Sequence, residues 1–159
     1  MNKSTIEKTN EFNNVAEISI SYKPKIPVNQ KPQIMCSNDI YKIMRKVFAD
    51  EVINHHEEFW ILLLNRTCRV LGTAKVAQGG IQECPVDIRI IFQYALKANA
   101  INIALCHNHP SNELKPSWQD KILTQRILEI GRFLNVEVID HLIVTENSYL
   151  SFADEGMLN

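Results

Sequence analysis

The stretch INIALCHNHPSNELKPSWQD at residues 101–120 constrains the fold of this chain more than any other segment. It begins with a mostly apolar run that ends at Cys106, a pattern typical of a buried β-strand. In an extended chain, the side chains of residues i and i+2 point to the same face of a sheet. His107 and His109 are therefore expected to direct two imidazoles toward one point.

The second half of the stretch predicts where a helix begins. Pro110 ends the strand, and Pro116 favours a helix start just after it. On that helix, Ser117 and Asp120 are i,i+3 neighbours on one face. The strand end and the first helical turn can thus bring two ring nitrogens, a carboxylate and a hydroxyl to one place.

Two imidazoles and a carboxylate form a ligand set that suits tetrahedral zinc. Three protein ligands leave one coordination position for water, as in catalytic rather than structural zinc sites. An H-x-H pair alone is common, so the specificity of the signal comes from the full H-x-H-P-x(6)-S-x(2)-D pattern. We predict that His107, His109 and Asp120 bind one Zn²⁺ per chain.

Hydrophobic periodicity along the rest of the chain predicts alternating strands and helices. Helices are expected from Ser37 to before His55, over 86–99 and over 118–134, and strands over 59–64, 68–78, 101–106, 136–144 and 149–152. A proline-containing segment over 23–35 should be an extended connection. This order predicts an α/β (α+β) fold, in which a mixed β-sheet is flanked by helices.

The chain of 159 residues is expected to form one domain. Residues 1–14 are polar and aperiodic and are predicted to be a flexible tail, followed by a single domain over 15–159 that begins with a half-buried strand at 16–22. No apolar run is long enough for a signal peptide or a membrane span, so we expect a cytoplasmic protein. The four cysteines form no C-x-x-C pair and are expected to be reduced, partly buried thiols.

The segment HNHPSNELKPSWQD resembles the JAMM motif of MPN+/JAB metalloproteases, H-x-H-x(7)-S-x(2)-D. Further segments resemble the RadC family of bacterial JAB-domain proteins: FWILLLNRTCRVLG, ALKANA, DHLIVT and YLSFADEG. The resemblance spans about residues 37–158 and implies the JAB/MPN-like, cytidine-deaminase-like architecture. One departure is Asn112, where the family usually has glycine, although asparagine also tolerates a left-handed backbone. Full RadC proteins also carry an N-terminal helix-hairpin-helix-type region, so a short form is expected.

The resemblance implies a zinc-dependent hydrolase that cleaves peptide or isopeptide amide bonds with an activated water. The family's general base is a glutamate just before the central strand, where Glu57 and Glu58 both stand. Alternation puts these two side chains on opposite faces, and the family pattern E-x-F, with Phe59 as its aromatic, indicates Glu57. Ser117 is a good helix N-cap and is also expected to donate a hydrogen bond to an oxyanion.

Other polar residues near the motif have less specific interpretations. Alternation turns Cys106 away from the metal, as a buried thiol. His55 and His56 are expected to be surface imidazoles. Asp140 and His141 are either supports behind the metal ligands or a polar pair at a strand edge, and the sequence leaves this open.

Charge, pI and the absence of other motifs argue against some alternative functions. The net charge of −1 and the pI near 6.5 argue against direct nucleic-acid binding, because such proteins usually carry a basic face. A non-hydrolytic accessory role in DNA repair or recombination is the alternative, since the RadC family traditionally carries that label. A nucleobase deaminase would need H-x-E followed by P-C-x-x-C, and this combination is absent. The expected partner is a peptide or protein substrate and no membrane, and the oligomeric state stays open, with a dimer as one option.

Overall fold

The computed structural model describes residues 22–23, 25–80 and 84–158. The elements in chain order are the 3₁₀ turn η1 (Val28–Gln30), α1 (Ser37–Val47), α2 (Asp50–Ile53), β1 (Glu58–Leu64), β2 (Val70–Gln78), α3 (Ile88–Lys97), β3 (Asn102–Asn108), α4 (Trp118–Leu134), β4 (Glu137–Val144) and β5 (Tyr149–Ser151). The predicted tail at 1–14 lies outside the described residues, as does nearly all of the strand predicted at 16–22. Both remain predictions, as does the single domain over 15–159.

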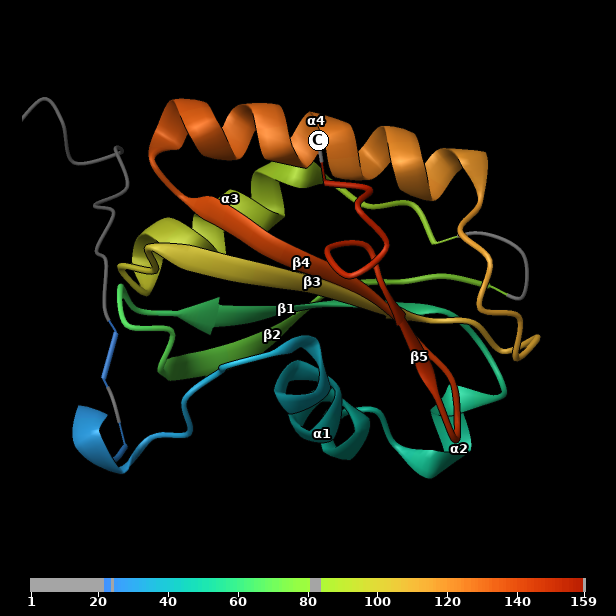
Figure 1. The fold of residues 1–159 in the computed structure, drawn as a ribbon, viewed down its shortest axis with the longest axis horizontal. Helices are drawn as coiled ribbons and strands as arrows, with labels where there is room; N and C mark the ends of the chain where they lie inside the picture. Colours follow the sequence, from blue (N-terminus) through green and yellow to red (C-terminus); the bar gives the residue numbers. More distant parts are fainter. Residues whose placement is uncertain (1–21, 24, 81–83, 159) are drawn as a thin grey trace, which may run out of the picture.

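Within the described residues, five strands form one mixed sheet with the order β2-β1-β3-β4-β5 (Figure 1). β1 pairs antiparallel with both β2 and β3, whereas β3 and β4 run parallel and are joined through α4. β5 closes the sheet by pairing antiparallel with β4. The prediction of a mixed sheet flanked by helices is confirmed, and the histidine motif lies at the end of β3, the central strand.

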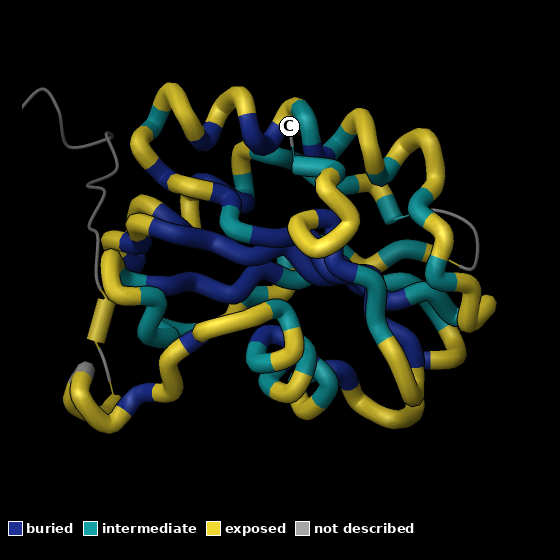
Figure 2. Tube along the Cα trace, in the orientation of Figure 1, coloured by how far each residue is buried: buried dark blue, intermediate teal, exposed yellow. Residues whose placement is uncertain are grey.

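Helices cover both faces of the sheet and produce two hydrophobic cores (Figure 1). One core joins the sheet to α3 and α4 through side chains such as Ile91, Leu105 and Ile127. The other joins it to α1 and α2 through side chains such as Met44 and Leu62. The central strands are buried between these layers (Figure 2), which explains why β1 and β3 are almost continuously apolar. The sheet is therefore a rigid frame for side chains at the ends of its strands.

The segment after Ser37 differs from its prediction. One helix was expected as far as the residues before His55, but the chain breaks after Val47, where Phe48 adopts an extended backbone with ψ 118°. Phe48 is only 2% exposed, so it packs in the core, and α2 begins as a separate helix at Asp50. The spacing of apolar residues in the sequence predicts this burial, but it does not predict where the first helix ends. The expected extended connection over 23–35 also contains the turn η1.

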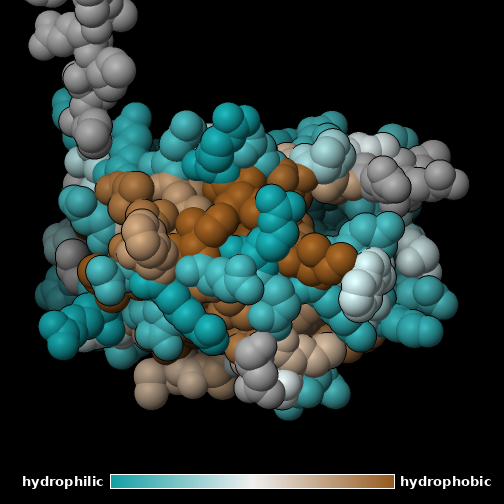
Figure 3. Space-filling model, turned by 90° about the horizontal axis from the view of Figure 1, so that it is seen from above, coloured by the Kyte–Doolittle hydropathy of each residue, from teal (hydrophilic) through white to brown (hydrophobic). Residues whose placement is uncertain are grey.

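The outer surface of α3 and α4 carries exposed apolar side chains, and Figure 3 shows brown atoms gathered on this face. The exposed large apolar residues on these two helices are Tyr94, Leu96, Trp118, Ile122, Ile130 and Phe133. Even so, within the described part of the chain no helix combines the length and apolar character that crossing a membrane requires.

Candidate metal centre

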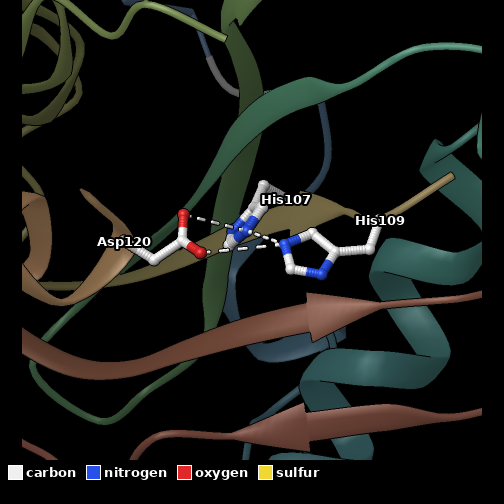
Figure 4. A group of neighbouring side chains, drawn as sticks. All are labelled: His107, His109 and Asp120. Atoms are coloured by element: carbon white, nitrogen blue, oxygen red, sulfur yellow. Dashed lines mark hydrogen bonds and ion pairs between the residues drawn. The ribbon is translucent and has the colours of Figure 1, made fainter. Parts of the chain in front are cut away.

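His107, His109 and Asp120 come together where β3 ends and α4 begins (Figure 4). The Nε2 atoms of the two histidines are 2.9 Å apart. Asp120 places Oδ1 3.3 Å from His107 Nε2 and Oδ2 3.7 Å from His109 Nε2. Among the described residues this is the one group of three or more potential protein ligands that could hold a metal ion. We call it the triad.

Alternation along β3 aims the two histidines, as the sequence predicts, while Asn108 between them points to the opposite side. His107 is 3% exposed, and its ring stacks on Phe59 with the ring centroids 6.0 Å apart. His109 follows the strand end, and its Nδ1 lies 2.8 Å from the backbone oxygen of Glu113. A carbonyl oxygen can only accept a hydrogen bond, so His109 Nδ1 carries the proton and its Nε2 faces the triad.

The N-terminus of α4 orients the Asp120 carboxylate. Ser117 is the N-cap, and its Oγ accepts a hydrogen bond from the backbone N–H of Asp120 at 3.1 Å. In return, Asp120 Oδ2 accepts from the backbone N–H of Ser117 at 2.7 Å, which completes a capping box. A serine that accepts as a cap keeps its own hydroxyl hydrogen for donation. The predicted cap is therefore confirmed, and the predicted oxyanion role is compatible with it.

The triad shifts the pKa values of its members. Partial burial alone would raise the pKa of Asp120, but hydrogen bonds with His107 and His109 outweigh burial and hold this pKa far below its usual range. Burial would lower the pKa of His109, but the Asp120 carboxylate and the Glu113 backbone oxygen raise it. The site thus stabilises a negative carboxylate and a positive charge beside it.

The donor set fits a small divalent cation. Ligands at about 2.0–2.1 Å on a tetrahedral zinc ion lie about 3.3 Å from one another. The three edges of the triad measure 2.9, 3.3 and 3.7 Å, which bracket this separation. Without a cation, the two imidazole nitrogens tolerate such proximity only when a proton lies between them. The spacing of His107, His109 and Asp120 therefore suits the zinc ion that the sequence pattern predicts.

A cavity of about 680 Å³ opens onto the triad. Glu57, just before β1, and Ser117, the N-cap of α4, both line it, and apolar side chains complete its wall: Phe59, Val86, Trp118 and Leu123. Glu57 shares this cavity with the triad, and its negative charge contributes to the raised pKa of His109. Burial and the same Glu57 charge raise the pKa of the Cys84 thiol, which also lines the cavity, to about 11. Cys84 is therefore a neutral thiol at neutral pH.

Glu58 lies on the other side of the sheet from Glu57. It is 4% exposed, pairs with Lys75 at 2.7 Å and accepts a hydrogen bond from Trp60 Nε1 at 2.8 Å. Burial would raise the pKa of Glu58, but the hydrogen bonds from Lys75 and Trp60 outweigh it and lower this pKa. The opposite orientation of the two glutamates follows the predicted alternation, whereas the burial of Glu58 in an ion pair is not readable from the sequence.

Asn108, the middle residue of the H-x-H motif, makes buried hydrogen bonds that the sequence analysis did not predict. Its side chain has no exposed surface. Asn108 Oδ1 accepts from the backbone N–H of Glu58 at 2.7 Å, and Nδ2 donates to the backbone oxygens of Ile53 and His56 at 3.0 and 2.8 Å. The amide therefore fastens the segment before β1 to β3. An asparagine between two histidines at the end of a buried strand is the signal that could have indicated this role.

The remaining candidates occupy distinct environments. His55 is exposed as expected, but His56 is partly buried, with Nε2 3.6 Å from Glu58 Oε1. Cys106 is fully buried in the core beside α1 and α2, away from the triad. Asp140 accepts hydrogen bonds from Ser151 Oγ and from the backbone N–H groups of residues 141 and 153, so it secures the end of β5.

The sequence left open whether Asp140 and His141 stand behind the metal ligands or at a strand edge, and the contacts of His141 distinguish the two. His141 has no exposed surface, and its Nε2 lies 2.8 Å from His107 Nδ1. Burial lowers the pKa of His141 well below its usual value. The neighbouring residues Asp140 and His141 thus face different partners, and of the two, His141 contacts a member of the triad.

The loop between the strand and the helix contains the noted departure from the family pattern. Asn112 has φ 60°, in the left-handed region that favours glycine, so asparagine fulfils the backbone requirement there. Its backbone N–H donates to the backbone oxygen of His109 at 3.0 Å. The substitution therefore preserves the tight turn that follows the second histidine.

Comparisons with known proteins agree with the geometry. A family model described as a RadC-like JAB domain matches residues 34–157. A UPF0758 protein of Flavobacterium johnsoniae is 43% identical over 125 residues, which cover 79% of this chain and 53% of the relative. For a UPF0758 protein of Porphyromonas gingivalis the identity is 36% over 135 residues, with 84% and 60% covered. The chain thus spans about half the length of these curated relatives.

Proposed function

Because this chain belongs to the RadC-like JAB domain family, we propose that it is a zinc-dependent hydrolase of peptide or isopeptide amide bonds. The observation that carries the proposal is the convergence of His107, His109 and Asp120 on one point at the end of a buried strand. Two imidazoles and one carboxylate form the ligand set of a hydrolytic zinc site, and a cavity beside them leaves room for a substrate.

The protein residues divide the chemistry of amide hydrolysis among them. When bound, zinc lowers the pKa of water to about 7 and polarises a carbonyl group. Glu57 accepts a proton from the attacking water and later delivers one to the leaving amine nitrogen. Ser117 donates its hydroxyl hydrogen to the oxyanion that develops on the substrate carbonyl, an interaction worth about 3 kcal/mol in comparable sites. His107, His109 and Asp120 hold the metal.

The positions of Glu57 and Ser117 support these roles. Both line the cavity that also contains the triad, Glu57 from the residue just before β1 and Ser117 from the N-cap of α4. Glu58 offers no comparable candidate, because its carboxylate is engaged by Lys75 and Trp60 on the far face of the sheet. The apolar wall formed by Phe59, Val86 and Trp118 suits a substrate with side chains flanking a polar amide, such as a peptide.

Activity profiling on a peptide library tests the proposed function. Purified protein loaded with zinc should cleave a subset of peptides, and a chelator should abolish this cleavage. Asp120→Asn serves as a matched control, because it keeps the side-chain volume and removes the negative ligand. Cleavage that persists in the chelator and in Asp120→Asn would contradict a zinc mechanism, as would the absence of cleavage by zinc-loaded protein across peptide and isopeptide libraries.

A further inference from the structure

His141 lies behind His107, on the strand β4 that runs parallel to β3. His141 Nε2 is 2.8 Å from His107 Nδ1, and His141 Nδ1 is 2.6 Å from the hydroxyl of Thr124 on α4. Thr124 Oγ1 is in turn 2.6 Å from the backbone oxygen of Asp120. The contacts form a chain of hydrogen bonds that starts at one member of the triad and ends at another. We call His141 and Thr124 the support pair.

The backbone oxygen of Asp120 determines which group donates and which accepts in each of these hydrogen bonds. The backbone oxygen of Asp120 can only accept, so Thr124 donates its single hydroxyl hydrogen to it. Two oxygens 2.6 Å apart would repel each other without that hydrogen. The Thr124 oxygen must then accept from Nδ1–H of His141, and because full burial keeps this ring neutral, its Nε2 carries a lone pair. His107 therefore donates through Nδ1–H, and its own Nε2 lone pair faces the triad.

Packing holds the His141 ring in the orientation that this chain requires. The ring lies against Phe152 and Phe59, with centroid separations of 4.6 and 5.6 Å. Thr124 is itself fully buried on the inner face of α4. Both members of the support pair are shielded from solvent, so water cannot replace a lost hydrogen-bond partner. The loss of one hydrogen bond therefore disturbs the next bond in the series.

We propose that His141 and Thr124 are positioning residues that hold His107 in the Nδ1–H tautomer, with Nε2 available as a metal ligand. This inference rests on the metal site of the proposed function and extends it to two residues that do not touch the metal position. Partners behind a ligating histidine commonly fix its tautomer and orientation, and their loss weakens metal binding. A merely structural polar pair would leave the tautomer of His107 and the metal affinity unaffected.

Thr124→Val provides the sharpest perturbation, because it keeps the shape of the side chain and removes the hydroxyl. His141 then lacks an acceptor for Nδ1–H, so its proton should move to Nε2 and His107 should switch to the Nε2–H tautomer. Thr124→Ser restores the hydroxyl and is the matched rescue. A second pair of variants perturbs the histidine itself, since His141→Phe removes the acceptor and His141→Gln supplies an oxygen in its place.

Two readouts test the inference on the full chain. Long-range proton–nitrogen NMR of metal-free protein at about pH 8, where an ordinary imidazole is neutral, distinguishes Nδ1–H from Nε2–H rings. We expect His107 to be Nδ1–H in the wild type and in Thr124→Ser, and Nε2–H in Thr124→Val. Zinc affinity should fall roughly 10–100-fold in Thr124→Val and His141→Phe and recover in Thr124→Ser and His141→Gln.

The outcomes separate this inference from the proposed function. An Nε2–H tautomer of His107 in the wild type would overturn the inference, as would wild-type zinc affinity in a folded Thr124→Val protein. A wild type with the expected tautomer that binds no zinc would support the tautomer assignment and contradict the proposed metal site. Because His141→Phe could also disturb the core, circular dichroism identifies unfolded protein, and Thr124→Val then decides the question.

Discussion

The side-chain oxygen of Asn108 accepts a hydrogen bond from the backbone N–H of Glu58 at 2.7 Å, across the start of the β1–β3 pair. This N–H belongs to the peptide bond that joins Glu57 to Glu58, and Glu57 lines the cavity of the triad. The residue between the two histidines therefore fixes the backbone that carries the proposed base. The H-x-H motif thus supplies two proposed ligands through its ends and a backbone anchor through its middle.

Replacing Asn108 should uncouple the proposed base from the proposed zinc site. Asn108→Ala leaves one buried N–H and two carbonyl oxygens without their Asn108 partner, which should destabilise the protein by roughly 2–4 kcal/mol. Zinc content should persist, because the triad itself is unchanged, while hydrolysis should fall as Glu57 loses its fixed position. Urea unfolding, zinc analysis and hydrolysis rates check these three expectations, and unchanged stability would contradict the anchor role.

Glu57→Gln should separate proton transfer from metal binding. Glutamine is nearly isosteric with glutamate and Glu57 is not a proposed ligand, so fold and zinc content should be retained. Hydrolysis should nonetheless fall by roughly 10²–10⁴-fold, the usual contribution of a positioned general base. Glu58→Gln is the matched control, and it should keep most of the hydrolytic activity because Glu58 faces away from the cavity. An active Glu57→Gln beside an inactive Glu58→Gln would mean that the base assignment is wrong.

The ion pair of Glu58 predicts a pH-dependent contribution to stability. Lys75 and Trp60 lower the pKa of Glu58 below its ordinary value of 4.5, so the folded state favours the charged form. This contribution is present above pH 4.5 and is lost as the pH falls through the lower folded-state pKa. Glu58→Gln should therefore cost about 1–2 kcal/mol at pH 7 and markedly less near pH 3. Urea unfolding of both proteins at the two pH values measures the difference, and a constant difference would refute the coupling.

Removal of the metal should lower the thermal stability without unfolding the chain. The two hydrophobic cores on either face of the sheet are built from side chains outside the triad, so they persist without a cation. Binding to the folded state alone adds stability that grows with metal concentration, so a chelator should lower Tm. The far-UV circular dichroism spectrum at room temperature should stay unchanged. Its collapse on chelation would instead identify a structural metal site.

The sequence predicts those features that local patterns determine. α4 runs from Trp118 to Leu134 as expected, because Pro116, the Ser117 cap and the 3.6-residue periodicity all act within a few residues. The convergence of His107, His109 and Asp120 follows from strand alternation and one helical turn, both of which are local geometry. The family resemblance adds Glu57, whose approach to the triad depends on how β1 pairs with β3.

Tertiary contacts explain what the sequence does not predict. The break after Val47 preserves the burial of Phe48, so periodicity alone cannot distinguish it from a continuous helix. The contact between His141 and His107 depends on the register of the parallel pair β3–β4, and residues far apart in the chain set that register. The burial of Glu58 likewise depends on Lys75 reaching it from β2. Each of these features requires knowledge of a neighbouring element.

Metal analysis of purified protein, compared with the double variant His107→Ala/His109→Ala, tests the central claim most directly. The wild type should contain about one zinc ion per chain, with Zn–N distances of roughly 2.0–2.1 Å by X-ray absorption. The double variant should fold but lose nearly all of the zinc, because only the Asp120 carboxylate remains of the triad. Full zinc retention by the folded double variant, or a wild type that takes up no zinc when the metal is supplied in excess, would contradict the account.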